Sequence, residues 1–532
     1  MPARADRLGV VQTSRRALLR GLAGAAGLVA LDACGHHGGT AAPTSTAATH
    51  PAAPVDWDAL RRKLSGTLRV PGDTGYAATY QLFNRRFDGI QPAGVVSARS
   101  VADVQAAVAF ARAHGLPVTA RSGGHSYVGA STNRGVVVDL RPLSSIGVSG
   151  TGATIGTGAA LVDVYAQLAA GGVSVPAGSC PAVGLAGLAL GGGQGVVSRQ
   201  YGLTCDRITS AQVVLADGRV VTASAASEPD LLWALQGAGA GFGIVTSLDL
   251  QTHATSALST SYHAFPWSAG ASVLTAWMAH LPAADRSVWS TCHLLASAEA
   301  KPAGQAGGSG PTVTVSCVRV GPSDGLRSAL APFLAAVGTA PTSASYRDRS
   351  YLDTMLLEAG CADTTVAACH VAGQSPAGTL PRDAFVAASD FFTVPIDSSA
   401  VDALVGAIEA RQHDRALAVG GAAFDTWGGA IADVAPDATA FVHRHVAFGA
   451  QYTASWAGQP GDGPQAANQA SLEKIKGTVS AAATGAAYQN YADPTLADAA
   501  TAYYGSNLPR LQRVKATYDP DDVFSAPGGL SS

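Results

Sequence analysis

The sequence contains little charge, and this scarcity limits the partners that the protein can have. Only 13% of its 532 residues are charged, and the formal net charge is -3. Beyond the N-terminus there is no run of lysine and arginine to attract a phosphate backbone, so we expect no nucleic-acid partner. The hydrophobic fraction of 47% is enough for a large buried core with more than one lobe, which excludes disorder for most of the chain.

Three motifs are also missing, and each absence excludes a class of site. No two cysteines are spaced as C-x-x-C, so we expect no zinc or other metal site. No G-x-G-x-x-G follows an expected strand, and "GAGAGFG" at 237–243 has the wrong spacing for a Rossmann dinucleotide site. The segment "GHSYV" at 124–128 lacks the last glycine of the hydrolase nucleophile elbow, G-x-S-x-G.

The N-terminus is typical of an export signal. Arg15 and Arg16 precede an apolar run at 21–31 that is too short and glycine-rich for a membrane span, and together they resemble a twin-arginine signal. Such a signal implies that the protein folds before the Tat machinery exports it, which suits a protein that must take up a cofactor first. "LDACG" around Cys34 resembles a lipoprotein box, so both a secreted protein and a lipid-anchored one on the outer side of the cytoplasmic membrane stay open. We expect residues 1–34 to form the signal and 35–54 a flexible linker.

The other cysteines suit an oxidising compartment, where disulfides form. Cys361 and Cys369 are close enough in sequence to close a short loop. Cys292 and Cys317 lie in two strand-like runs that they could link. The sequence does not fix which pairs form.

From residue 55 onward, short apolar runs alternate with helical patterns. The spacing predicts a helix capped by Ser100 and then a strand over Leu116–Ala120 that enters the glycine loop "RSGGHSYVGAS" at 121–131. Gly123, Gly124 and Gly129 of this loop can adopt positive φ and leave amides open for a pyrophosphate. A second glycine loop follows at 178–195, and two such loops in one half of the chain suggest one extended ligand. His125 could by itself be a structural imidazole.

Five motifs in order carry a resemblance to a known family. They are "RSGGHSYVG", "GSCPAVGLAGLALGGGQG", "YGLTCDRITSAQVVLADGRVVTAS", "DLLWALQGAGAGFGIVTS" and "YQNYADPTLADAATAYYGSNLPRLQRVKATYDPDDVF". Together they resemble the berberine-bridge-enzyme-like FAD-linked oxidases from Pro71 to Phe524. The resemblance implies an α+β fold with a two-lobed PCMH-type FAD-binding domain and a substrate domain of antiparallel sheet and helices. We expect the FAD-binding domain at 55–255, the substrate domain at 256–478, and a C-terminal segment at 479–532 that returns to the FAD-binding domain.

The resemblance implies FAD as the cofactor, bound covalently. His125 would join the flavin 8α-methyl group and Cys180 the flavin C6, which would raise the flavin's reduction potential. For Cys180, a buried inert thiol is the alternative. Leu188 stands where many doubly linked relatives carry histidine, and Gln194 replaces a tyrosine of plant relatives. The other cofactor-binding residues that the resemblance implies are Arg121, Ser122, Gly123, Gly124, Ser126, Gly129, Val183, Gly184, Gly187, Gly191, Gly192, Gly195, Gly243, Val245 and Asn490.

The same resemblance assigns the catalytic base to Tyr488. Tyr127 is a second candidate, and Gln451 lies on the expected polar strand "FGAQYTASW", in which Gly449 occupies the place of a lysine in relatives. A phenol of ordinary pKa, near ~10, needs cationic or hydrogen-bonding neighbours to act as a base at neutral pH. Aromatic packing at the domain seam is the alternative role for Tyr488.

The pattern of "YQNYADP" also predicts how its side chains are arranged. Alternation along an extended segment would put Tyr488 and Asn490 on one face, with Gln489 and Tyr491 on the other.

These residues predict an oxidase acting on an alcohol, such as a carbohydrate hemiacetal or a secondary-metabolite hydroxyl. Tyr488 would take the hydroxyl proton, hydride would pass to the flavin, and O2 would reoxidise the flavin to give H2O2. Val183 stands where the family places a gate beside the flavin, and a valine there leaves room for oxygen. A dehydrogenase with a quinone or protein acceptor is one alternative. A flavin-less binding protein of the same fold is another, although it would have lost His125 and Cys180.

Overall fold

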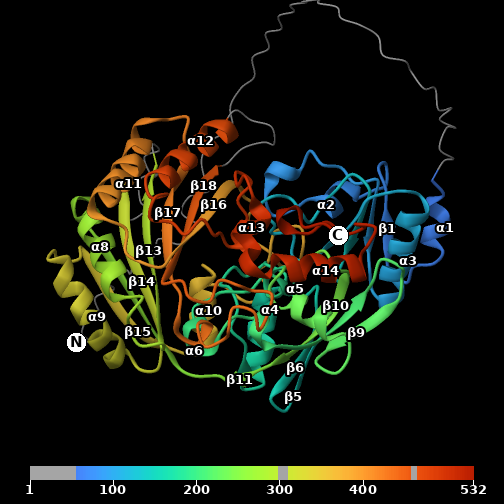
Figure 1. Ribbon diagram of the computed structural model, residues 1–532, viewed down its shortest axis with the longest axis horizontal. Helices are drawn as coiled ribbons and strands as arrows, with labels where there is room; N and C mark the ends of the chain where they lie inside the picture. Colours follow the sequence, from blue (N-terminus) through green and yellow to red (C-terminus); the bar gives the residue numbers. More distant parts are fainter. Residues whose placement is uncertain (1–54, 298–309, 457–463) are drawn as a thin grey trace, which may run out of the picture.

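The computed structural model describes residues 55–297, 310–456 and 464–532, which form two lobes side by side (Figure 1). The predicted export signal, the linker and Cys34 lie outside the described residues. Within the described ranges, no helix is both long and apolar enough to cross a membrane. The predicted α+β class is confirmed.

The first lobe begins with a four-stranded sheet in the order β1-β2-β4-β3, in which β2, β3 and β4 are parallel. The helix expected after Ser100 is confirmed as α3, and Ser100 and Asp103 form a capping box at its start. The strand that enters the first glycine loop is β3, which begins at Val118 rather than at Leu116. The elements are α1 (Trp57–Arg61), β1 (Thr67–Arg69), α2 (Tyr76–Tyr80), β2 (Gly94–Ser97), α3 (Val101–Ala113), β3 (Val118–Arg121) and β4 (Val136–Asp139).

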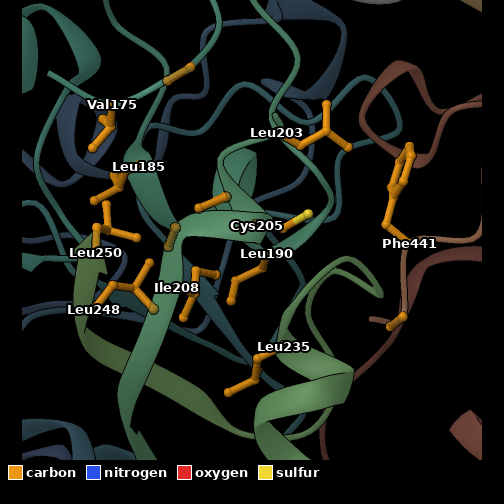
Figure 2. Close-up of a cluster of buried hydrophobic side chains, with 14 of the residues drawn as sticks. Val175, Leu185, Leu190, Leu203, Cys205, Ile208, Leu235, Leu248, Leu250 and Phe441 are labelled. Atoms are coloured by element: carbon orange, nitrogen blue, oxygen red, sulfur yellow. The ribbon is translucent and has the colours of Figure 1, made fainter. Parts of the chain in front are cut away.

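A second, antiparallel sheet in the order β5-β6-β10-β8-β9 completes this lobe. Figure 2 shows part of its core, in which Leu185 and Leu190 of α5 share one apolar cluster with Ile208 of β8 and Leu248 of β10. Because this cluster lies beneath the second glycine loop, the loop rests on a rigid layer. The elements are β5 (Ile146–Ser149), β6 (Gly152–Gly156), α4 (Leu161–Ala170), β7 (Val173–Ser174), α5 (Leu185–Leu190), α6 (Ser198–Tyr201), β8 (Ile208–Val214), β9 (Val220–Ser224), α7 (Pro229–Leu235), β10 (Ile244–Gln251) and β11 (His253–Ala254).

The second lobe is a seven-stranded antiparallel sheet in the order β15-β12-β14-β13-β17-β18-β16. Helices α8, α9, α11 and α12 cover one face and enclose a core that contains Trp277, Phe392 and Phe424, so the other face is left to the first lobe (Figure 1). The elements are β12 (Leu258–Phe265), α8 (Gly270–His280), β13 (Val288–Ala296), β14 (Thr312–Val320), α9 (Ser323–Val337), β15 (Ser343–Arg349), α10 (Tyr351–Glu358), β16 (Ala384–Phe392), α11 (Ser398–Ala410), β17 (Val419–Thr426), β18 (Phe448–Trp456) and α12 (Pro464–Gly477).

The C-terminal segment returns to the first lobe through α13 (Ala499–Tyr504) and α14 (Leu508–Tyr518) (Figure 1). Arg510 of α14 forms an ion pair with Asp230 of α7 and lies over the ring of Trp233. The buried Lys515 donates to the carbonyl oxygens of Gly241 and Phe524, so the end of the chain is fixed to the "GAGAGFG" loop.

Of the two disulfides that the sequence allows, one forms. Cys361 and Cys369 are bonded and close the short loop. Cys292 and Cys317 do not pair, and both thiols are free and buried. In the register of β13 and β14, Cys292 lies opposite Val315 and Cys317 opposite Ser290, so the two cysteines are diagonal neighbours in an apolar core.

Candidate active site

The two glycine loops cross at Gly123 and Gly184. A Cβ atom on Gly123 would lie 2.1 Å from the amide nitrogen of Gly184, and one on Gly184 would lie 2.1 Å from that of Gly123. Only glycine at both positions allows this approach. The crossing places the loop of His125 beside the loop of Cys180, and the two loops form one wall of a cleft of about 1340 Å³ between the lobes.

His125 and Cys180 both line this cleft. His125 is half-buried with its Nε2 atom inside, and desolvation lowers the pKa of the ring to about 3. Within the described part of the chain, Nε2 has no hydrogen-bond partner. The imidazole is therefore neutral, with one ring nitrogen unengaged. Cys180 lies close enough to Tyr491 that a thiolate there would help to raise the pKa of Tyr491, after the larger effect of burial.

The other predicted cofactor residues fall into two groups. Ser122, Gly124, Ser126, Val183, Gly187, Gly195, Gly243, Val245 and Asn490 line the cleft together with Gly123 and Gly184. A Cβ on Gly187 would meet no atom within 4 Å, so the wall is open there to a bound group.

The second group, Arg121, Gly129, Gly191 and Gly192, lies outside the cleft lining and supports the wall. Arg121 pairs with the buried Asp139 at 2.9 Å. A Cβ on Gly191 would lie 2.1 Å from Oδ1 of Asn490, so this glycine lets the C-terminal segment approach the second loop.

Tyr488 is fixed beneath the second glycine loop. Its phenol oxygen accepts hydrogen bonds from the backbone N–H groups of Gly193, at 2.8 Å, and Gln194, at 3.2 Å, and from Nδ2 of Asn490, at 3.0 Å. Burial raises the pKa of Tyr488, and these three donors oppose that rise. The donors are of the kind that a phenolate base needs, but they also occupy the oxygen that such a base would present to substrate.

The predicted alternation along "YQNYADP" is wrong. Residues Gln489–Tyr491 form a turn of 3₁₀ helix, so Asn490 reaches Tyr488 by turning back rather than across an extended strand. The ring of Tyr491 then lies beside that of Tyr488, with centroids 4.9 Å apart at an interplanar angle of 73°.

A second group of polar side chains lines the cleft next to Tyr488. Gln451 of β18 donates through Nε2 to the phenol oxygen of Tyr127 at 2.5 Å, and the Tyr127 ring stacks parallel to that of Tyr491 at 6.0 Å. Asp425 of β17 also lines the cleft. Burial raises the pKa of Tyr491, and the negative charge of Asp425 raises it further.

Tyr491 and Asp425 are site residues that the sequence analysis missed. Alternation assigned Tyr491 to the face opposite Tyr488, and Asp425 carries no motif beyond its place near the end of an alternating strand, "VGGAAFDT".

The sheet presents hydroxyl side chains to the same cleft. They come from neighbouring strands of the second lobe and are Thr260, Thr291, Thr314, Ser316, Thr453 and Ser455. Short hydroxyl groups both donate and accept hydrogen bonds, so this wall suits a ligand that itself carries many hydroxyl groups.

Comparison with known proteins decides the family. The family model described as "FAD binding domain" matches residues 92–224, and the one described as "Berberine and berberine like" matches residues 487–531. The FAD-linked oxidoreductase YgaK of Bacillus subtilis is 30% identical over 476 residues, which cover 87% of this chain and 96% of YgaK. The chain belongs to the berberine-bridge-enzyme-like (BBE-like) FAD-linked oxidoreductases.

Two further relatives place this BBE-like enzyme among proteins of known structure and named activity. The solved structure of BBE-like 1 from Physcomitrella patens has a TM-score of 0.78 at 28% identity, covering 89% of this chain and 98% of that one. The chitooligosaccharide oxidase of Gibberella zeae is 31% identical over 460 residues, which cover 83% of this chain and 87% of the relative. The predicted family and the predicted FAD-linked enzyme are therefore confirmed.

The residues of this BBE-like enzyme fit FAD. The matched FAD-binding region contains both glycine loops, and the open wall at Gly187 leaves room for a bound group. Among the residues that the structure describes, Nε2 of His125 has no hydrogen-bond partner, so this ring nitrogen is available as a nucleophile. His125, Cys180 and the backbone of the two loops are the groups that would hold the cofactor.

Proposed function

We propose that this enzyme oxidises a hydroxyl group of a carbohydrate, at a hemiacetal carbon or a related alcohol, with FAD bound covalently through His125 and Cys180. The observation that carries the proposal is the meeting of three features in one cleft: the unengaged His125 nitrogen, the group formed by Tyr127, Gln451 and Tyr491, and the hydroxyl-lined sheet. The similarity to a chitooligosaccharide oxidase supports a sugar as substrate.

The protein's own residues would bind the substrate and take its hydroxyl proton. Bound FAD supplies the acceptor for the hydride and passes the electrons on to oxygen. Hydroxyl groups of the sheet and the amide of Gln451 would orient the sugar, and the two lobes would keep water from the reacting carbon.

Two phenols compete for the role of base. Tyr488 is the residue that the resemblance assigns, but its oxygen already accepts three hydrogen bonds. The negative charge of Asp425 adds to the rise in the pKa of Tyr491 and keeps its phenol neutral. The Asp425 carboxylate would also accept the phenol proton. We therefore propose a relay in which the substrate proton passes to Tyr491 as the phenol proton passes to Asp425.

Oxygen is the acceptor that we propose, because Val183 lines the cleft and is smaller than leucine. A quinone or protein acceptor remains the competing proposal. Export through the Tat pathway, with or without a lipid on Cys34, is proposed from the N-terminal sequence alone. Cell fractionation with an Arg15→Lys, Arg16→Lys variant tests the export.

The experiment that tests the function is a screen of the purified yellow protein against mono- and oligosaccharides and simple alcohols, with oxygen consumption and H2O2 as readouts. We expect turnover with at least one reducing sugar. Flavin reduction by no sugar or alcohol under anaerobic conditions would overturn the proposal. Reduction without oxygen consumption, followed by turnover with a quinone, would make the enzyme a dehydrogenase.

A further inference from the structure

The chain segment that carries the active-site tyrosines runs along β16, the edge strand of the large sheet. The N–H of Thr484 donates to the carbonyl oxygen of Phe391 at 2.9 Å, and the N–H of Phe391 donates to that of Ala486 at 3.2 Å. The N–H of Tyr488 then donates to Oγ of Ser389 at 3.1 Å. The start of the segment is thus tied to the outer edge of β16.

The far end of the same segment is tied, through Lys476, to Asp390 of β16, the residue after Ser389. Asp493, two residues after Tyr491, has a buried carboxylate that bonds to Nζ of Lys476 on α12 at 2.5 Å. The same ammonium group lies 3.4 Å from Oδ1 of Asp390 and donates to the carbonyl oxygen of Ser389 at 3.3 Å. One lysine therefore links the end of the tyrosine segment to the strand that holds its beginning.

The charges of this cluster depend on pH in the physiological range. Two carboxylates, Asp390 and Asp493, face one ammonium group, and the buried phenol of Tyr452 lies beside Asp390. Burial raises the pKa of Asp390 to about 6, against the opposing effect of Lys476, and the charge of Asp493 adds to the rise. Above that pH Asp390 pairs with Lys476, and below it Lys476 is left with Asp493 alone.

We propose that Asp390, Lys476 and Asp493 form a positioning network that holds the segment of Tyr488 and Tyr491, and with it the proposed base Tyr491, in its catalytic orientation. Asp390 and Lys476 lie outside the cleft lining, and Asp493 is the member of the network that borders the cleft. The effect of the network on turnover rests on the proposed function, in which a tyrosine of this segment receives the substrate proton. Loss of the link from Lys476 loosens one end of the segment, where the N–H of Asp493 still donates to the phenol of Tyr503, so the phenol of Tyr491 spends less time in line with the hydroxyl proton.

Hydrogen–deuterium exchange of the holoenzyme tests the network without any substrate. In Lys476→Met, the amides of residues 484–493 should exchange at least about tenfold faster than in wild type, because their hydrogen bonds open more often. Lys474→Met is the matched control, since Lys474 is an exposed lysine on the same helix. Equal protection of 484–493 in wild type and Lys476→Met would overturn the proposal.

Anaerobic flavin reduction by a sugar found in the screen tests the catalytic consequence. Lys476→Met should lower the limiting reduction rate by about tenfold, with less change in the half-saturating sugar concentration, and Lys476→Arg should restore most of the rate. In wild type, the reduction rate should rise as the pH passes 6, because Asp390 then ionises and pairs with Lys476. The asparagine of Asp390→Asn has the same shape but no charge, so the rate of this variant should stay at the low-pH level of wild type. An unchanged pH profile in Asp390→Asn would overturn the proposal.

The two experiments separate the network from the proposed function. If no sugar or alcohol reduces wild type, the proposed function fails, and the exchange experiment still decides the network. Flavin content and melting temperature show whether each variant is folded. If Lys476→Met does not fold, Asp390→Asn decides both the exchange and the pH profile.

Discussion

The imidazole of His125 stacks on the ring of Phe83, with centroids 4.0 Å apart and an interplanar angle of 14°. This contact fixes the plane of the ring, while Nε2 finds no hydrogen-bond partner among the described residues. A nucleophile that is held still and kept neutral is prepared for a covalent bond, because no proton has to be removed from it and little rotational freedom is lost.

The first prediction follows from this arrangement. Acid-denatured wild-type protein should keep its yellow colour, and His125→Ala and Cys180→Ala should each retain flavin through the remaining bond. Only the double variant should release all flavin into the supernatant. Complete release from the wild type would show that neither bond forms, and release from His125→Ala alone would leave Cys180 as an inert thiol.

The second prediction separates the two phenols. Tyr491→Phe should slow anaerobic flavin reduction by about 10²-fold or more, the usual size of a general-base contribution. Asp425→Asn should slow it as well, because the relay loses its final proton acceptor. Tyr488→Phe removes an oxygen that accepts two backbone hydrogen bonds, so the larger effect there should be lower thermal stability. A larger loss of reduction rate in Tyr488→Phe than in Tyr491→Phe would return the base to Tyr488.

The third prediction concerns the oxygen acceptor. Val183→Leu adds one methylene group to the cleft wall and should slow reoxidation of the reduced enzyme by oxygen, while reduction by sugar stays close to wild type. Stopped-flow mixing of reduced enzyme with oxygenated buffer measures it. Val183→Ala is the matched control and should reoxidise at least as fast as wild type. Equal reoxidation rates in all three proteins would remove Val183 from the oxygen path.

The fourth prediction concerns acid stability. His263 is 1% exposed, and neither ring nitrogen bonds to any residue in the described ranges. Burial lowers its pKa to about 4. Because the folded-state pKa lies below the unfolded value near ~6.5, His263 favours the folded state above pH ~6.5 and loses this contribution as the pH falls towards 4. The loss amounts to roughly 3 kcal/mol.

Chemical unfolding between pH 7 and about 4.5 measures this loss. His263→Leu should flatten the dependence of the free energy of unfolding on pH over that range. His114→Leu, at an exposed position, should leave the slope unchanged. An identical slope in wild type and His263→Leu would show that the buried imidazole does not govern acid stability.

The fifth prediction concerns the disulfide. The loop closed by Cys361 and Cys369 follows Leu357–Gly360, which lines the cleft. Directly after the loop, Nε2 of His370 lies 3.2 Å from Oδ1 of Asp163 on α4. Replacing both cysteines by serine should lower the free energy of unfolding by about 2 kcal/mol, the entropy expected for a short loop. The half-saturating sugar concentration should rise because the cleft wall is less fixed. Replacing the free cysteines Cys292 and Cys317 by alanine is the control, because the effect of a reducing agent on the stability of that variant should be the same as on wild type.

The sequence by itself determined those features that depend on neighbours in the chain. Ser100 and Asp103 cap a helix three residues apart, and the glycines around His125 and Cys180 mark loops at strand ends, because backbone sterics act locally. Ordered motifs likewise indicated the FAD-linked family before any contact was known.

Only the tertiary structure decided which side chains meet. The sheet register keeps Cys292 and Cys317 apart, and the lobes bring Tyr127 to Gln451 and Tyr491. The turn at Gln489–Tyr491 replaces the expected alternation, because three donors from the glycine loop and Asn490 capture the Tyr488 oxygen. Such contacts join residues hundreds of positions apart, and their free energy comes from burial and hydrogen bonds between lobes, which local sequence does not encode.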